Sequence, residues 1–264
     1  MIAHRGASSI APENTLLAFR LAIEASAEMI ETDAHLARDG EVVLIHDADL
    51  RRTTSCGGSV ADLRASDLAS CDAGYWFTQL GGHRHPFRGL GLVVPRLSEL
   101  LRLAESLNPA VIINVEIKNM PDEMDYDPTN RLARRLVNLL TGINSLDRVL
   151  VSSFNADAID CVKELESDIR TAYLSGPRAD LHARTAYARA RGHIAIHPHH
   201  SSLGHGDGAR RIVNVMHEAG LEVNVWTVND PQRMLEMAAA GVDGIITDDP
   251  GQLRQLLERE AAST

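Results

Sequence analysis

The chain has 264 residues, a length that suits one large α/β domain. Its net charge of −10 and isoelectric point of about 5.6 argue against a nucleic-acid-binding protein, because the basic residues are scattered and form no basic patch. With 44% hydrophobic and 23% charged residues, the composition is that of a soluble globular protein with a normal core.

Short β-branched segments alternate with helical patterns along the chain. The predicted strands cover residues 2–4, 30–33, 111–117, 149–152, 171–174, 194–197, 223–228 and 244–247. The first helix would bury Leu16, Phe19 and Ile23 after a cap at Asn14 or Thr15. Eight strands with helical crossovers favour an α/β fold of the (β/α)8 TIM barrel type, with a doubly wound open sheet as the alternative.

A hairpin is predicted at the end of the second strand. Asp39-Gly40 separates two strand-like segments, 31–38 and 41–46, and this dipeptide favours a two-residue turn. Such a turn would pair Arg38 with Glu41, and therefore Asp33 with His46. We expect the hairpin to fold over the mouth of the barrel and to return His46 to Asp33.

Residues from about 48 to 96 lack the alternating pattern and contain many glycines, among them Gly81 and Gly82. We predict an insertion at the carboxyl-terminal face of the barrel, where connecting loops carry function. Residues 95–101 then begin the next barrel helix, and Pro250 suits the first turn of the last one. The whole chain, 1–264, is expected to form a single barrel domain with this insertion.

Three carboxylates are expected to meet at the mouth of the barrel. Side chains alternate along a strand, so Glu31 shares a face with Asp33, and Glu116 shares one with Lys118. Buried carboxylates are costly unless they are paired or bind metal. Oxygen ligands favour Mg²⁺ or Ca²⁺ over Zn²⁺, which predicts one divalent cation. The alternative is a set of structural ion pairs with Lys118 and Arg5.

Two histidines and two cations should face the same cavity. His4 ends the first strand and His46 ends the hairpin, and imidazoles titrate near neutral pH, which favours an acid/base pair. Arg5 and Lys118 are suited to hold phosphate oxygens. Arg5 has the alternative of an ion pair with Glu13 or with a metal-binding carboxylate.

Trp226 should face inward near the mouth, because it alternates with Asn224 along the strand. It would pack against the substrate's glycerol or alcohol, or else fill the barrel. A group of histidines follows the sixth strand: His197, His199, His200 and His205. No cysteine accompanies them, so they predict loop residues rather than a zinc site.

The order and spacing of several motifs resemble the glycerophosphodiester phosphodiesterase family. The most specific are His4-Arg5-Gly6, Pro12-Glu13-Asn14-Thr15, Glu31-Thr32-Asp33, Asp39-Gly40 and His46-Asp47. Further matches are Arg52-Thr53-Thr54, Glu116-Ile117-Lys118, Ser153-Phe154, Trp226-Thr227-Val228-Asn229 and Thr247-Asp248. The resemblance covers nearly the whole chain.

This resemblance implies a barrel that hydrolyses small glycerophosphodiesters, with a divalent metal, to glycerol 3-phosphate and an alcohol. It makes His4 and His46 the acid/base pair, and Arg5 and Lys118 the phosphate contacts. The implied metal ligands are Glu31, Asp33 and Glu116. The attacking nucleophile is either water or the glycerol 2-hydroxyl.

Three other functions were weighed against this one. A lipid-directed enzyme on the same barrel, such as a lysophospholipase D or a sphingomyelinase D-like lyase, would need an apolar mouth. Residues 75–77 (Tyr-Trp-Phe) suit either that mouth or, as the favoured alternative, a small core that anchors the insertion. A non-catalytic binding domain is disfavoured because no expected histidine or carboxylate is missing. A serine hydrolase is disfavoured because no Gly-x-Ser-x-Gly motif occurs.

The cysteines and the N-terminal segment bear on location. Cys56, Cys71 and Cys161 are odd in number and lack metal-binding spacing, which argues against a disulfide framework and for a reducing, cytoplasmic compartment. The first residues lack the features of a signal peptide, and no apolar run is long enough for stable membrane insertion.

Overall fold

A closed ring of parallel strands forms the centre of the protein. The computed structural model describes residues 1–78, 84–143 and 146–263. The parallel strands are β1 (Ile2–His4), β2 (Met29–Leu36), β4 (Ile112–Ile117), β5 (Val149–Ser153), β6 (Arg170–Ser175), β7 (Ala195–Pro198), β8 (Glu222–Val225) and β9 (Gly244–Thr247). Their order is β1-β9-β8-β7-β6-β5-β4-β2, and pairing of β1 with β2 closes the ring. This confirms the predicted (β/α)8 barrel and excludes the open sheet.

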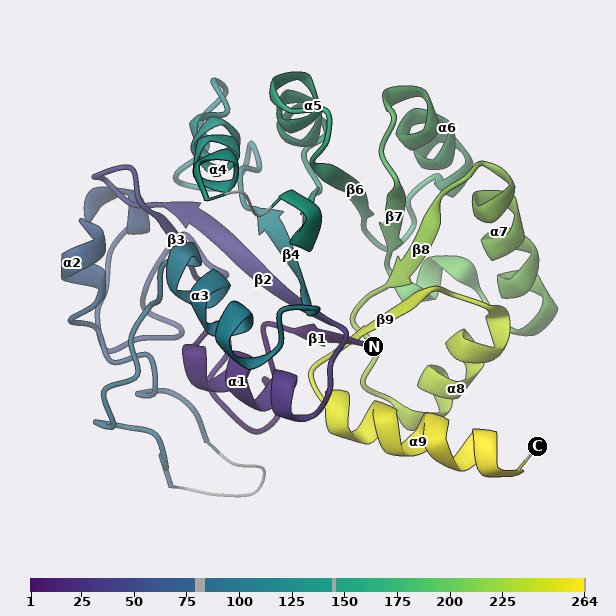
Figure 1. Ribbon diagram of the computed structural model, residues 1–264, viewed down its shortest axis with the longest axis horizontal. Coiled ribbons are helices and arrows are strands. Elements are labelled where there is room, and N and C mark those ends of the chain that lie inside the picture. The colour runs from purple at the N-terminus through teal and green to yellow at the C-terminus, as the bar shows by residue number, and fades with distance from the viewer. Residues whose placement is uncertain (79–83, 144–145, 264) are drawn as a thin grey trace.

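Helices surround the strands (Figure 1). The barrel helices are α1 (Leu16–Glu24), α3 (Leu97–Leu107), α4 (Arg131–Gly142), α5 (Ala156–Leu165), α6 (Leu181–Arg191), α7 (Gly206–Glu218), α8 (Pro231–Ala240) and α9 (Pro250–Ser263). Short 3₁₀ turns cover Leu146–Arg148 and His200–Leu203. Thr15 caps α1, as expected, by accepting a hydrogen bond from the Ala18 amide. Among the described helices, none is long and apolar enough to cross a membrane.

Side chains alternate along each strand between the apolar core outside the barrel and the cavity inside it. Ile30, Ile113 and Val115 are buried in the apolar layer between the strands and the helices. Their neighbours Glu31 and Glu116 therefore point to the inside of the barrel. The registers of β1 with β2 and of β2 with β4 bring these inward side chains to neighbouring positions.

The hairpin exists, but its predicted register is wrong by one residue. The antiparallel strand β3 (Val42–Leu44) pairs with β2 so that Leu36 lies opposite Val42. The loop has three residues, 38–40, because Gly40 has a positive φ of +83° whereas Asp39 does not. The two-residue turn that Asp-Gly favours needs positive φ at both central residues, whereas a three-residue loop needs only one.

The insertion after β3 has its own small core and a disulfide bond. It contains a 3₁₀ turn at Val60–Asp62 and α2 (Ala65–Leu68), and its buried members include Leu50, Val60 and Leu68. Residues 79–83, including Gly81 and Gly82, lie outside the described residues. Phe77 is buried and packs edge-on against Phe87, whereas Tyr75 is exposed.

Cys56 and Cys71 form a disulfide within the insertion, and Cys161 is free and buried. The cysteine count argued against a disulfide framework, and this one disulfide contradicts that expectation. An odd number of cysteines excludes complete pairing but not one pair. The cysteines no longer support a reducing compartment, so a cytoplasmic location stays a prediction without that support.

Candidate active site

The candidate site is a cavity of about 210 Å³ at the carboxyl-terminal ends of the barrel strands. Its lining includes seven of the eight predicted site residues: His4, Arg5, Glu31, His46, Glu116, Lys118 and Trp226. The eighth, Asp33, adjoins it through the carboxylate cluster described next. The sequence therefore predicted side chains that do meet, although they come from five separate segments of the chain.

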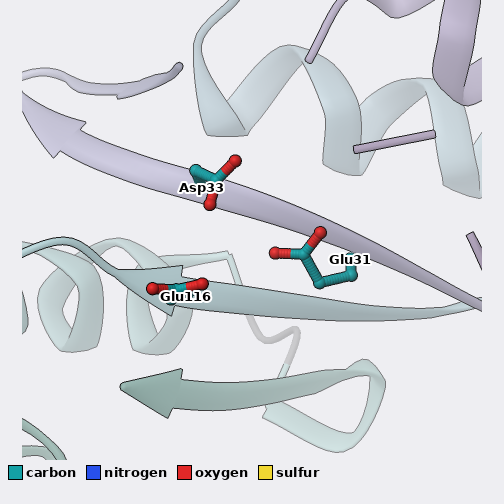
Figure 2. A group of neighbouring side chains, drawn as sticks. All are labelled: Glu31, Asp33 and Glu116. Carbon is teal, nitrogen blue, oxygen red and sulfur yellow. The ribbon is translucent and has the colours of Figure 1, made fainter. Parts of the chain in front are cut away.

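The carboxylates of Glu31, Asp33 and Glu116 gather beside one another. One oxygen of each lies within 4.8 Å of the others, and all three residues are buried. Asp33 is the register partner of Glu116 on the neighbouring strand. Figure 2 shows the three carboxyl groups on the same side of β2 and β4. Three hard oxygen donors this close fit a site for Mg²⁺ or Ca²⁺.

The electrostatics of the cluster differ from one carboxylate to the next. Burial and the charges of Asp33 and Glu116 raise the pKa of Glu31 well above its usual range. Burial raises the pKa of Glu116 as well. Burial alone would also raise the pKa of Asp33, but the charges of Lys118 and Arg5 lower it well below its usual range. Three buried carboxylates thus face two cations, which leaves an excess of negative charge.

Lys118 and Arg5 lie against the cluster. Lys118 Nζ is 2.7 Å from Glu116 Oε1 and 3.1 Å from Asp33 Oδ1. Arg5 Nη1 is 2.8 Å from Glu13 Oε1, and Arg5 Nε is 3.2 Å from Asp33 Oδ2. Both ion pairs that the sequence offered as alternatives for Arg5 are therefore present, while its side chain still lines the cavity.

A left-handed turn places Arg5 there. Arg5 has a φ of +57° and Gly6 a φ of +83°, and a Cβ on Gly6 would lie 2.5 Å from the Ala18 carbonyl carbon. The backbone amide of Arg5 donates to Glu31 Oε2 at 3.0 Å. The requirement for glycine at position 6 thus follows from the close approach of α1.

His4 is held by a carboxylate from the last strand. His4 Nδ1 lies 2.6 Å from Asp248 Oδ1. Asn229 Nδ2 donates to Asp248 Oδ2 at 2.6 Å, and the Ser8 hydroxyl donates to Asp248 Oδ1 at 3.1 Å. A carboxylate acceptor at Nδ1 fixes the proton on that nitrogen and leaves Nε2 for the cavity.

His46 is held in the same way, although its position differs from the prediction. Ile45, not His46, lies opposite Asp33, and its amide donates to the Asp33 carbonyl at 3.0 Å. His46 follows the end of β3 and still lines the cavity. Its Nδ1 donates to Asp47 Oδ1 at 2.5 Å. Burial lowers the pKa of His46, and the charges of Lys118 and Arg5 act in the same direction.

A third histidine supports the backbone of His46. His35 is fully buried, its Nε2 donates to the His46 carbonyl at 3.0 Å, and its Nδ1 lies 2.7 Å from Asp125 Oδ2. Both partners are acceptors, so both ring nitrogens carry protons. Burial opposes this charged form, but the hydrogen bond to Asp125 raises the pKa of His35.

Two aromatic residues, Trp226 and Phe154, also line the cavity. β8 ends at Val225, earlier than predicted, and Trp226 follows it with its indole N–H donating to the His197 carbonyl at 2.9 Å. The rings of Trp226 and Phe154 meet edge-on at 5.3 Å, and both line the cavity. Trp226 therefore faces inward near the mouth, as expected, and presents carbon rather than its polar group.

His197 lies within β7, and His199, His200 and His205 follow this strand. His197 is buried in the barrel, and burial lowers its pKa to about 3. His199 stacks on His200, and His205 lies 2.9 Å from Glu236 on α8.

Sequence reasoning gave no role to the partners of the two histidines. Asp47 and Asp248 stand in motifs that served only to establish the resemblance to the family. The signal at Asp47 is its direct adjacency to His46, and the signal at Asp248 is its place at the end of the last strand. Asn14 was read as a possible cap, yet its Nδ2 donates to Asp33 Oδ2 at 2.8 Å.

The chain is similar to known proteins along nearly its whole length. The model of the glycerophosphoryl diester phosphodiesterase family matches residues 4–252. A glycerophosphodiester phosphodiesterase from Caldanaerobacter subterraneus subsp. tengcongensis is 31% identical over 260 residues, which cover 98% of each chain.

Two solved structures are also similar. One is a putative glycerophosphoryl diester phosphodiesterase from Silicibacter pomeroyi, with a TM-score of 0.85, 26% identity and coverage of 98% of this chain and 93% of that one. The other is an Oleispira antarctica phosphodiesterase in complex with the product sn-glycerol-3-phosphate, with a TM-score of 0.83, 26% identity and coverage of 97% and 96%. The chain belongs to the glycerophosphoryl diester phosphodiesterase family.

Proposed function

We propose that the protein hydrolyses glycerophosphodiesters to glycerol 3-phosphate and an alcohol, and that it needs a divalent cation to do so. The observation that carries this proposal is the cavity in which three buried carboxylates, two cations and two histidines meet. The product found in the Oleispira antarctica relative supports the same chemistry. A single phosphodiester anion suits this cavity better than a polyanion, because the protein as a whole carries a charge of −10.

Glu31, Asp33 and Glu116 would hold the cation, either Mg²⁺ or Ca²⁺. Once bound, it would supply Lewis-acid polarisation of the phosphate and neutralise the excess negative charge of the cluster. Arg5 and Lys118 would bind the non-bridging phosphate oxygens, Arg5 through its fork and Lys118 as a point charge. The ion pairs of Arg5 and Lys118 with Asp33 hold both side chains at the edge of the cavity.

The two histidines would move protons at the attacking oxygen, which belongs to water or to the glycerol 2-hydroxyl, and at the departing oxygen of the ester. His46 suits the base, because burial lowers its pKa and its neutral form accepts a proton at Nε2. His4 would donate a proton to the departing alcohol oxygen. The carboxylate of Asp248 holds Nδ1 of His4 and so leaves Nε2 to face this oxygen. Each Nδ1 is fixed by a carboxylate, so neither ring turns during the transfer.

Trp226 would contact the apolar part of the substrate. Its indole N–H is already bonded to the His197 carbonyl, so its ring offers only carbon surface to the cavity. Together with Phe154 it forms an aromatic part of the cavity lining, suited to carbon atoms of the glycerol or of the alcohol.

A substrate panel tests this function. Cleavage should be measured as glycerol 3-phosphate release from water-soluble glycerophosphodiesters, as release of the headgroup alcohol from lysolipids and sphingomyelin, and as strand scission of DNA and RNA, each with and without chelator. We expect cleavage of the water-soluble diesters only, and only without chelator. Preference for lysolipid or sphingomyelin would favour the lipid-directed enzyme, and no cleavage of any diester would refute the proposal.

A further inference from the structure

The insertion contributes one side chain to the hydrogen-bond network behind the cavity. Arg52 follows His46 by six residues and lies next to two carboxylates. Its Nε donates to Asp47 Oδ2 at 2.5 Å, while Nη1 and Nη2 donate to the two oxygens of Glu13 at 2.9 and 2.8 Å. A planar guanidinium can hold two carboxylates in fixed directions, which an ammonium group cannot do.

Each of these carboxylates leads to a different part of the candidate site. Asp47 accepts the Nδ1 proton of His46 at 2.5 Å. Glu13 lies 2.8 Å from Nη1 of Arg5. The charges therefore alternate in one continuous chain from the histidine to the phosphate-binding arginine, and Arg52 is its central member.

We propose that Arg52 is a positioning residue that sets the imidazole of His46 relative to the guanidinium of Arg5. This inference rests on the proposed function, in which these two groups act on one phosphodiester. Arg52 itself is not among the residues that line the cavity. Its effect would pass through Asp47 on one side and Glu13 on the other.

The local structure suits a fixed anchor rather than a free surface charge. Leu50 is buried in the core of the insertion, and the Thr54 amide and hydroxyl both donate to its carbonyl, at 3.0 and 2.9 Å. The Cys56–Cys71 disulfide joins the next part of this segment to the residues that follow α2. Arg52 thus stands on a turn that is held on both sides.

The neighbouring residue provides a matched control. Arg51 also binds a carboxylate through two nitrogens, but its partner is Asp49, and its own side chain is 77% exposed. Neither residue of that pair contacts the site network. Exposed pairs of this kind contribute little to stability, and this pair lies outside the site network, so its loss should leave both folding and activity unchanged.

The two sides of the network should respond differently to loss of Arg52. Without it, Asp47 keeps only the hydrogen bond to His46 and is free to turn, so the imidazole loses its direction. Arg5 retains its ion pair with Asp33 at 3.2 Å and still binds phosphate. Loss of Arg52 should therefore lower kcat far more than it changes KM.

The experiment compares Arg52→Gln, Arg52→Lys and Arg51→Gln with the wild-type protein on a soluble glycerophosphodiester. We expect Arg52→Gln to lower kcat by about 10- to 100-fold, the usual effect of losing such an outer partner, with KM changed by less. The kcat of Arg52→Lys should stay well below that of the wild type, because a lysine side chain cannot span both carboxylates. Arg51→Gln should match wild type. Added guanidinium, at concentrations far below those that unfold proteins, should partly restore Arg52→Ala.

A second measurement needs no activity. Long-range ¹H–¹⁵N spectra report which nitrogen of His46 carries the proton, and His46→Ala identifies its signals. We expect the Nδ1–H form in the wild type and in Arg51→Gln, and a mixture of forms in Arg52→Gln.

The outcomes separate this inference from the proposed function. Equal kcat in Arg52→Gln and Arg51→Gln, together with an inactive His46→Ala, would overturn the role of Arg52 and leave the function standing. Should the wild type cleave no diester, the function fails while the spectra still test the positioning. An unchanged Nδ1–H form in Arg52→Gln would then overturn the inference. Matched thermal unfolding of the variants shows that each compared protein is folded.

Discussion

The carboxylate cluster should destabilise the protein when no cation is bound, and Glu31→Gln should relieve this cost. The oxygens of the three carboxylates lie within 4.8 Å of one another. At that separation and an effective dielectric constant of about 20, two unit charges repel by roughly 3.5 kcal/mol. Lys118 and Arg5 offset part of this repulsion through their contacts with Asp33 and Glu116.

Protonation sets an upper bound on the penalty at Glu31. Its pKa lies well above the usual value of 4.5, so at pH 7 the folded protein can take up a proton instead of bearing the repulsion. Taking up that proton costs about 3 kcal/mol at pH 7. Glutamine carries no charge and can still accept the Arg5 amide hydrogen bond that Glu31 accepts at 3.0 Å. Glu31→Gln should therefore stabilise the metal-free protein by about 1–3 kcal/mol, or roughly 2–10 °C in Tm.

The sign of the pH dependence follows from the same shift. Because the folded pKa is raised, the penalty is absent below the unfolded pKa and grows as pH rises through the window above it. The stability difference between Glu31→Gln and wild type should vanish near pH 4 and increase toward pH 7. Glu13→Gln is the matched control, and it should lower stability instead of raising it. The ion pairs of Glu13 with Arg5 and Arg52 lower the pKa of this carboxylate against the effect of burial.

Thermal unfolding with EDTA, and then with excess Mg²⁺ or Ca²⁺, measures these effects. The free energy of unfolding of the wild type should rise by about 2.7 kcal/mol at a cation concentration one hundred times Kd, whereas that of Glu31→Gln should rise much less. The reasoning would be refuted if Glu31→Gln lowered Tm in EDTA as Glu13→Gln does, or if it kept the full stabilisation by the cation.

Three further predictions concern other parts of the molecule. His4→Ala and His46→Ala should each lower kcat at least about a hundredfold in steady-state assays. The loss of kcat in the double variant should be far smaller than the product of the two single losses. A near-normal kcat in either single variant would remove that histidine from the mechanism. The acidic limb of kcat/KM should lie below pH 6.5, because the lowered pKa of His46 keeps the base neutral to lower pH, and a limb above 6.5 would contradict this role. Replacing Cys56 and Cys71 by serine should lower the free energy of unfolding by about 3 kcal/mol, the value for a disulfide with a sequence separation of 15, and unchanged urea unfolding would contradict it.

The sequence predicted the barrel well because its strands are short, β-branched and regularly spaced. The positions of Glu31, Asp33 and Glu116 followed from alternation alone, since a two-residue period places them on the inner face. These are local properties, and the chain closes into a ring without altering them.

The sequence predictions failed where the structure depends on backbone conformation or on contacts between residues far apart in the chain. Asp39-Gly40 suits a two-residue turn, but only Gly40 takes a positive φ, so the register shifted by one residue. His46 reached the cavity nonetheless because it lies beyond the end of β3 and is free of that register. The contact of Asp248 with His4 joins residues near opposite ends of the chain, so no local sequence pattern predicts it.

The central claim is that Glu31, Asp33 and Glu116 bind a cation that the hydrolysis requires. Its most direct test is glycerol 3-phosphate release from a soluble glycerophosphodiester by metal-free protein, titrated with Mg²⁺ or Ca²⁺, for wild type and Glu116→Gln. The account predicts no release without metal, saturable activation of the wild type, and activation of Glu116→Gln only at much higher cation concentration. Full turnover by rigorously metal-free protein, or equal activation of the two proteins, would contradict it.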